Sequence, residues 1–71
     1  MSKMTVLNRE ISLGHQMHHL RLNLGLSPGI LAKRAGTSTE EVRLIEHNLP
    51  VRLDARRRIL RELLATKSRQ H

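Results

Sequence analysis

The sequence predicts an all-α fold, and the spacing of its apolar residues, its residue types and its length lead to that prediction. Leucines recur with helical rather than alternating spacing, and β-branched residues are sparse. Phe, Tyr and Trp are absent, so any core must be built from Leu, Ile, Val, Ala and Met. The 71 residues suffice for one domain near the lower size limit for a hydrophobic core, and no cysteine can form a disulfide. We therefore expect a compact bundle of four to five helices.

The first helix is expected to begin at Arg9 or Leu13, after an N-terminal arm formed by residues 1–8, in which Val6 and Leu7 could serve as an anchor. It carries one apolar stripe, which consists of Leu13, Met17, Leu20 and Leu24. The next residue is a glycine, which suits a left-handed C-terminal cap. The helix is therefore predicted to end at Leu24.

Two short helices should follow. Ser27 is a good N-cap, and Pro28 at the first helical position gives up only an amide that would have no partner. The buried side of this second helix is expected to consist of Ile30, Leu31, Ala32 and Ala35, and Gly36 ends it. The third helix starts with a capping box, in which Ser38 accepts from the amide of Glu41 and the Glu41 carboxylate reaches back. Its inward residues are expected to be Val42 and Ile45.

The third helix should close at His47 and Asn48, because the following Leu49-Pro50 pair forces a break. A short helical turn is expected over residues 49–53. A last helix then begins at the N-cap Asp54 and runs to about Thr66, and residues 67–71 form a basic tail. The predicted domain therefore covers residues 9–66.

The charge of the chain points to an anionic partner. Thirteen Lys and Arg residues against six Asp and Glu residues give a formal net charge of +7, which favours nucleic acid or an acidic membrane surface. Without aromatic rings the protein cannot stack single-stranded bases, whereas duplex binding through phosphates and groove edges needs none. No apolar stretch approaches the ~20 residues that span a bilayer, and the N-terminus has no signal-peptide pattern. We expect a cytoplasmic protein that binds duplex DNA.

The motif that carries this expectation covers residues 28–47. Two helices that cross over a short turn need small residues at the crossing, and Ala32 and Gly36 fill those positions. Leu31, Ala35, Val42 and Ile45 supply the apolar contacts between the pair. The second of the two helices is then left standing out from the surface, where it can enter a major groove.

Residues Met17 to Glu46 resemble the phage-repressor and Cro-like helix-turn-helix family, also called the XRE family. The matching residues are Leu20-Arg21, Gly25-Leu26-Ser27, Leu31-Ala32, Ala35-Gly36, Thr37-Ser38, Val42 and Ile45-Glu46. The resemblance implies a lambda-repressor-like DNA-binding domain that acts as a sequence-specific regulator, typically a repressor, and binds a palindromic operator as a homodimer.

The resemblance also implies roles for particular residues. Base readout would fall to Thr39, Glu40, Arg43 and Leu44. Contacts to the DNA backbone would come from Ser27, Ser38, His47, Asn48, Arg52 and Arg56. A buried ion pair of Arg21 with Glu46 would fix the angle of the reading helix.

Some of these roles have alternatives. Arg43 could instead pair with Glu40 or Glu46 along the helix, and the arginines of the last helix could simply form a solvated face. The family often has Gln where this chain has Pro28, so phosphate affinity would rest more on the last helix or on the tail.

The last helix carries a wide apolar face. A homodimer through this face would bury Ile59, Leu60, Leu63 and Leu64, with Leu60 and Leu64 favoured over Leu63. The alternative is that all four side chains close the core of the monomer.

Other function classes fit less well. A protein-binding module, such as an antitoxin or an antiactivator, remains the main alternative, favoured by the acidic pair Glu40-Glu41. His15, His18 and His19 have a spacing that could hold a metal, but without a matching carboxylate they are expected to form a solvated polar face. No hydrolytic triad or phosphate-binding glycine loop is present, so no enzyme, cofactor or small-molecule ligand is expected. A basic membrane-surface helix is the weakest reading, because the apolar and capping pattern is that of a packed bundle.

Overall fold

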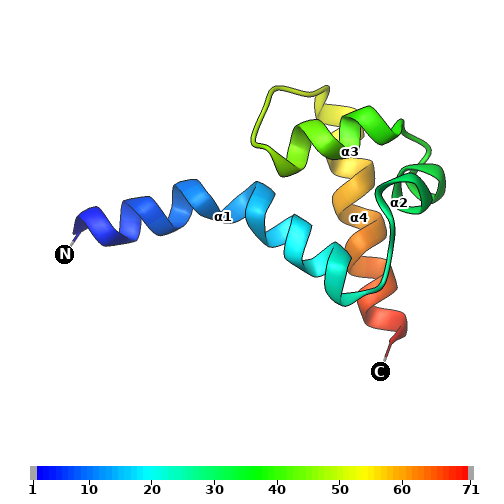
Figure 1. The fold of residues 1–71 in the computed structure, drawn as a ribbon, viewed down its shortest axis with the longest axis horizontal. Coiled ribbons are helices and arrows are strands. Elements are labelled where there is room, and N and C mark those ends of the chain that lie inside the picture. Colours follow the sequence, from blue (N-terminus) through cyan, green and yellow to red (C-terminus); the bar gives the residue numbers. More distant parts are fainter. Residues whose placement is uncertain (1, 71) are drawn as a thin grey trace.

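The structure, a computed structural model, describes the backbone of residues 2–70 and the side chains of residues 13–70. It contains four helices, which are α1 (Ser2–Asn23), α2 (Pro28–Ala35), α3 (Thr39–Glu46) and α4 (Leu53–Arg69). No strand occurs between residues 2 and 70. The predicted all-α fold is therefore confirmed, with four helices arranged around one core (Figure 1).

The helix bounds differ from the prediction at several places. The backbone of residues 2–8, expected as an arm, is already part of α1, and α4 continues to Arg69 instead of ending near Thr66. The side chains of Val6 and Leu7, the expected anchor, lie outside the described side chains. Residues 49–52 contain no helical turn.

The start of α4 also differs. Arg52 is its N-cap and makes no side-chain cap bond, whereas Asp54 lies in the first turn and pairs with Arg58 at 3.0 Å. A carboxylate is favourable at either position, because it meets unpaired amides at the cap and the positive end of the helix dipole in the first turn. Asp54 does mark the start of this helix, but it lies in the first turn and is not the N-cap that was predicted.

Each of the first three helices is followed within two residues by a residue in the left-handed conformation. These residues are Gly25, Gly36 and Asn48, with φ angles of 72°, 74° and 59°. The amide after each of them bonds back across the last helical turn, with Leu26 N to Arg21 O at 3.1 Å, Thr37 N to Ala32 O at 2.9 Å and Leu49 N to Leu44 O at 2.8 Å. This is the Schellman motif, which satisfies otherwise unpaired carbonyl groups. The predicted helix stops at Gly25, Gly36 and Asn48 are confirmed.

The core is aliphatic and is shared by all four helices. Its buried members are Met17, Leu26, Leu31, Ala32, Val42, Ile45, Ile59 and Leu63. Helix α2 packs against both α3 and α4, which brings the short helices onto one side of the last helix (Figure 1). Two residues of the predicted apolar faces lie outside this core, because Leu13 is 44% and Ile30 48% exposed.

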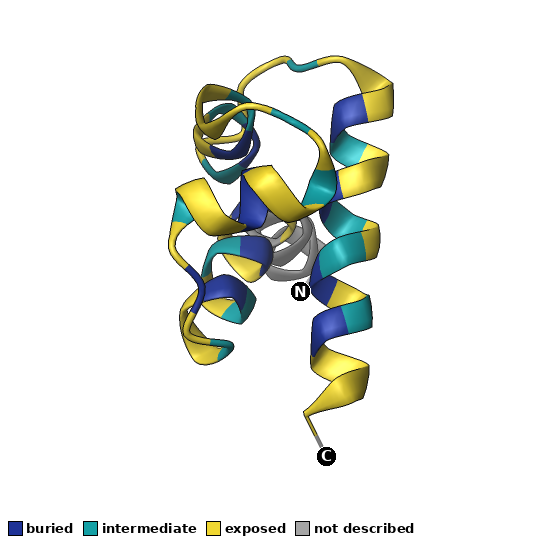
Figure 2. Ribbon diagram, turned by 90° about the vertical axis from the view of Figure 1, so that its right-hand side faces the viewer, coloured by how far each residue is buried: buried dark blue, intermediate teal, exposed yellow. Residues whose placement is uncertain are grey.

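Helix α4 buries one side only, as the dark-blue positions along the inner side of the C-terminal helix show in Figure 2. Ile59 and Leu63 are 1% and 0% exposed, so they belong to the core of the single chain. Their assignment to a dimer interface is therefore corrected, because a partner could not reach them without opening the core. Leu60 is half-buried against the core, and Leu64 is 51% exposed.

The close approach of α1 to α3 depends on Gly14. A Cβ atom at this position would lie 2.5 Å from the Ile45 carbonyl oxygen and 2.6 Å from Asn48 Oδ1. The Gly14 amide donates to that same Asn48 oxygen at 3.1 Å. Any side chain larger than hydrogen would therefore separate α1 from the end of α3. Within the described part of the chain, no helix is long and apolar enough to cross a membrane.

Candidate nucleic-acid interface

Helix α3 is held at its start by the predicted capping box. Glu41 N donates to Ser38 Oγ at 3.1 Å, and Ser38 N donates to Glu41 Oε1 at 3.0 Å. The other carboxylate oxygen of Glu41 accepts from Arg52 Nε at 2.9 Å. These hydrogen bonds, from Arg52 first and from the Ser38 amide second, lower the pKa of Glu41. The charge of Glu41 is therefore compensated within the protein by Arg52, which lessens the net negative charge at the Glu40-Glu41 pair.

The two sides of α3 differ in burial. Val42 and Ile45 are 1% and 3% exposed and face the core, as predicted. Thr39, Glu40 and Arg43 are exposed, and Leu44 is half-buried. The structure thus leaves three of the four expected base-reading residues open to a ligand.

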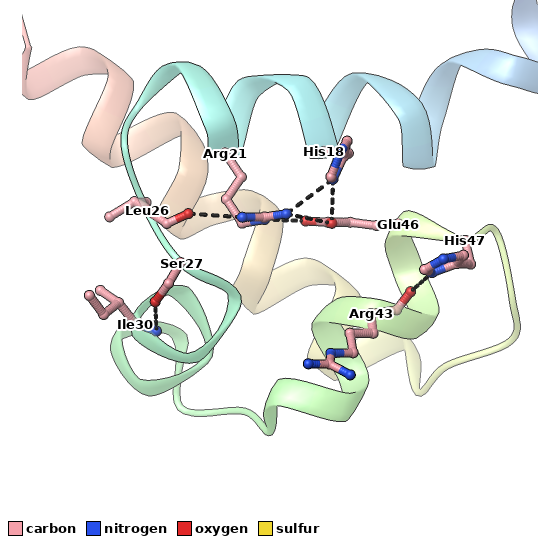
Figure 3. A network of polar contacts seen from close by, with 8 residues as sticks. All are labelled: His18, Arg21, Leu26, Ser27, Ile30, Arg43, Glu46 and His47. Carbon is pink, nitrogen blue, oxygen red and sulfur yellow. Dashed lines mark hydrogen bonds and ion pairs between the residues drawn. The ribbon is translucent and has the colours of Figure 1, made fainter.

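The Arg43 side chain extends from α3 away from the contact between Arg21 and Glu46 (Figure 3). Among the described residues, neither Glu40 nor any other group makes a hydrogen bond or ion pair with this guanidinium. Glu46, the other partner considered for it, is engaged by Arg21 instead. Arg43 therefore offers a fork of unpaired donors on the exposed side of the helix.

The predicted ion pair between Arg21 and Glu46 is present and ties α1 to the end of α3 (Figure 3). Arg21 Nε lies 2.7 Å from Glu46 Oε2, and Nη2 lies 3.1 Å from Oε1, which makes the pair bidentate. Arg21 is only 6% exposed, and its Nη1 also donates to the Leu26 carbonyl at 2.9 Å. One guanidinium thereby links α1, the loop before α2 and α3.

His18 joins this ion pair, which the sequence analysis missed. Its Nδ1 lies 2.7 Å from Glu46 Oε1 and 3.1 Å from Arg21 Nη2. His18 stands three residues before Arg21 on α1, so helical spacing places both on one face and could have revealed the contact. Burial raises the pKa of Glu46, but hydrogen bonds from Arg21 and His18 outweigh burial and leave the pKa lowered.

The expected contacts to the DNA backbone divide between the two ends of α3. Ser27 and Arg52 are exposed near its start, where a Cβ on Gly29 would lie 3.8 Å from Thr39 Oγ1. Ser27 and Ser38 are both N-caps, and the hydroxyl of Ser27 accepts from Ile30 N at 3.1 Å. The N-terminal ends of α2 and α3 therefore lie side by side.

The remaining backbone candidates are more constrained. His47 Nδ1 lies 2.8 Å from the Arg43 carbonyl, and the Asn48 side-chain oxygen is used by Gly14. Arg56 is half-buried, and its Nε is buried without a partner among the described residues. His47 and Asn48 are both exposed, but the side-chain oxygen of Asn48 is already engaged within the fold, and Arg56 is half-buried.

The three histidines of α1 differ in their exposure. His15 and His19 are exposed, with ring centroids 4.4 Å apart, whereas His18 is half-buried in the ion-pair network. Within the described part of the chain, no three His, Cys, Asp or Glu side chains gather as a metal site would require. The expectation of a solvated face is corrected for His18.

We compared the chain with models of protein families, with curated proteins and with solved structures, and none of them matches it.

Proposed function

We propose that the protein is a sequence-specific duplex-DNA-binding regulator, acting as a repressor in the cytoplasm, and that α3 is its reading helix. The observation that carries this proposal is the exposed Arg43, whose guanidinium has no partner among the side chains of residues 13–70, on a helix whose opposite side is buried in the core. An arginine on a helix in the major groove can donate two hydrogen bonds to one guanine. The resemblance of residues 17–46 to the Cro-like helix-turn-helix family supports the same assignment.

The orientation of α3 favours recognition of a defined sequence. Base readout requires that a side chain reach one base edge in a fixed geometry. The orientation of α3 relative to the rest of the domain must therefore be fixed. The bidentate Arg21–Glu46 pair holds one end of α3 against α1, and the Arg52–Glu41 ion pair links the other end to the N-cap of α4. The net charge of +7 supplies the attraction to phosphates on which affinity for DNA largely depends.

A homodimer would explain how so small a domain recognises a palindromic operator. Leu60 and Leu64 lie on one side of α4, and Leu64 is 51% exposed. A two-fold contact between two α4 helices would cover this apolar strip and set two α3 helices about 34 Å apart, one turn of DNA.

The test uses the DNA immediately upstream of the coding sequence and a scrambled duplex of equal length. Fluorescence anisotropy of the labelled duplexes should show tighter binding to the upstream DNA and a steep loss of affinity with salt. Arg43→Ala should weaken specific binding by about 1–3 kcal/mol, which is roughly five- to 150-fold. Lys33→Ala removes one positive charge from an exposed position of α2 that is assigned no DNA contact, and it should have a small effect. Equal affinity of the protein for the upstream and the scrambled duplex would contradict the proposal. So would an equal loss of affinity for the upstream duplex in Arg43→Ala and in the control variant.

A protein-binding module, such as an antitoxin or an antiactivator, is a second candidate. The exposure of Leu53 (65%) and Leu64 (51%) on α4 favours it, because such side chains suit a protein contact. It predicts that binding to the partner protein survives Arg43→Ala and is lost in Leu60→Asp.

A further inference from the structure

A hollow between the end of α2 and the first half of α4 is lined mainly by arginines. We call it the arginine groove, and its cationic residues are Arg34, Arg57, Arg58 and Arg61. All four are exposed, and the two helices that carry them pack directly against each other (Figure 1). None of the residues that were individually assigned a DNA contact lines this groove. It is therefore a second charged surface, which the reading helix does not account for.

The acidic residues of the groove are already engaged. Asp54 pairs with Arg58 at 3.0 Å, and Glu62 Oε2 accepts from Thr66 Oγ1 at 3.2 Å and from Arg69 Nη2 at 3.3 Å. Among the described residues, no hydrogen bond or ion pair engages the guanidinium groups of Arg34, Arg57 or Arg61. The arginines of the groove outnumber its two carboxylates, and the low-dielectric walls of the hollow strengthen the resulting positive potential. The groove is thus prepared for an anionic ligand.

The shape and charge pattern of the groove favour a peptide over a duplex. The hollow is lined by residues of α2 and α4 alone, which form a small surface that a short extended chain can cover, whereas a duplex presents its phosphates on a broad convex surface. Asp54 and Glu62 also line the groove, and they would repel a continuous phosphate backbone. A peptide can place neutral residues opposite these two carboxylates and acidic ones opposite the arginines. The guanidinium fork matches a carboxylate in bidentate geometry.

We propose that the arginine groove binds an acidic segment of a protein partner, whose carboxylates pair with Arg34, Arg57 and Arg61. Because the groove is separate from the exposed face of α3, such a partner can bind while α3 is occupied. The Arg58 guanidinium lies beside the α2–α3 turn, where a Cβ on Gly36 would come within 3.2 Å of its Nη1. A ligand in the groove therefore lies next to the turn that sets the position of α3.

The test measures binding of a fluorescently labelled peptide of alternating glutamate and alanine to the full chain at near-physiological salt. The double variant Arg34→Gln/Arg61→Gln removes two charges from the groove. The matched control Lys33→Gln/Arg43→Gln removes two exposed charges from α2 and α3 outside the groove. We expect the groove variant to lose about tenfold or more in peptide affinity and the control to stay within about twofold. Circular dichroism confirms that both variants keep their helices.

Binding of an operator duplex is measured with the same proteins. Loss of duplex binding in the control with retention in the groove variant shows two independent surfaces. If no protein binds duplex DNA but the peptide result stands, the DNA-binding proposal fails and the groove proposal holds. Three results overturn the groove proposal: no peptide binding by the unaltered chain, equal losses of peptide affinity in both double variants, or a greater loss of duplex than of peptide in the groove variant. The last result would identify a phosphate contact.

Discussion

Substituting Gly14 by Ala should destabilise the protein, although the same change raises helix propensity. In the interior of a helix, Ala is favoured over Gly by about 0.8–1 kcal/mol. Here the new methyl group would meet the Ile45 carbonyl oxygen at 2.5 Å. An ordinary C···O separation is at least about 3.3 Å, so α1 must withdraw from α3 by close to ~0.8 Å. The propensity gain is thus opposed by a backbone clash that no side-chain rotation relieves.

The expected loss of stability in Gly14→Ala follows from the contacts that are disturbed when α1 moves away from α3. Overpacking of this kind costs about 1–3 kcal/mol. The hydrogen bond from Gly14 N to Asn48 Oδ1, now 3.1 Å long, would weaken as well, at about 0.5–1.5 kcal/mol. After the propensity gain is subtracted, we expect a net loss of about 1–3 kcal/mol in the free energy of unfolding.

Urea denaturation followed by circular dichroism measures this free energy. The matched control is Gly29→Ala, which makes the same substitution in α2, where the nearest atom to the new Cβ is Thr39 Oγ1 at 3.8 Å. That variant should be neutral or more stable than the parent by about 0.5–1 kcal/mol. Should Gly14→Ala prove as stable as Gly29→Ala, the close contact between α1 and α3 would be refuted.

Three further predictions concern the ion pair, the cap and the apolar strip. Glu46→Gln removes the counterion of a buried guanidinium and should cost about 3–5 kcal/mol at neutral pH. Burial raises the pKa of Glu46, but accepted hydrogen bonds hold it below 4.5, so this stability is present above pH 4.5 and lost as the pH falls through the lowered pKa. Urea melts in acid should show a weaker pH dependence for the variant than for the parent. Ser38→Ala deletes half of the capping box and should lower the free energy of unfolding by about 1 kcal/mol, measured in the same way. Leu64→Asp should abolish self-association in sedimentation velocity, whereas Leu22→Asp, at a site 53% exposed on α1, should not. A monomeric parent would refute the dimer.

Local signals in the sequence predicted local structure well. The helix stop at Gly36 and the capping box of Ser38 and Glu41 were correctly placed, because each depends on a few neighbouring residues. The ion pair of Arg21 with Glu46 spans 25 residues and came instead from the family resemblance, not from any local pattern.

Features that depend on tertiary packing were not predicted. An apolar face of a helix shows that something covers it, but not whether a helix of the same chain or a partner does so. Ile59 and Leu63 were therefore placed at an interface although they close the core. Gly14 gave no signal either, because a glycine within a helix shows its role only when the opposing backbone is in place. The DNA-reading role of Arg43 stays a prediction.

The three left-handed helix stops have a consequence for recognition. Between α2 and α3 only residues 36–38 lack helical structure, and backbone bonds such as Thr37 N to Ala32 O span this connection. The entropy of ordering these residues is lost during folding, so little remains to be lost when a ligand arrives. If α3 reads DNA as proposed, its connection to α2 is ordered before the encounter, and discrimination between ligands should appear mainly in how long each one stays bound.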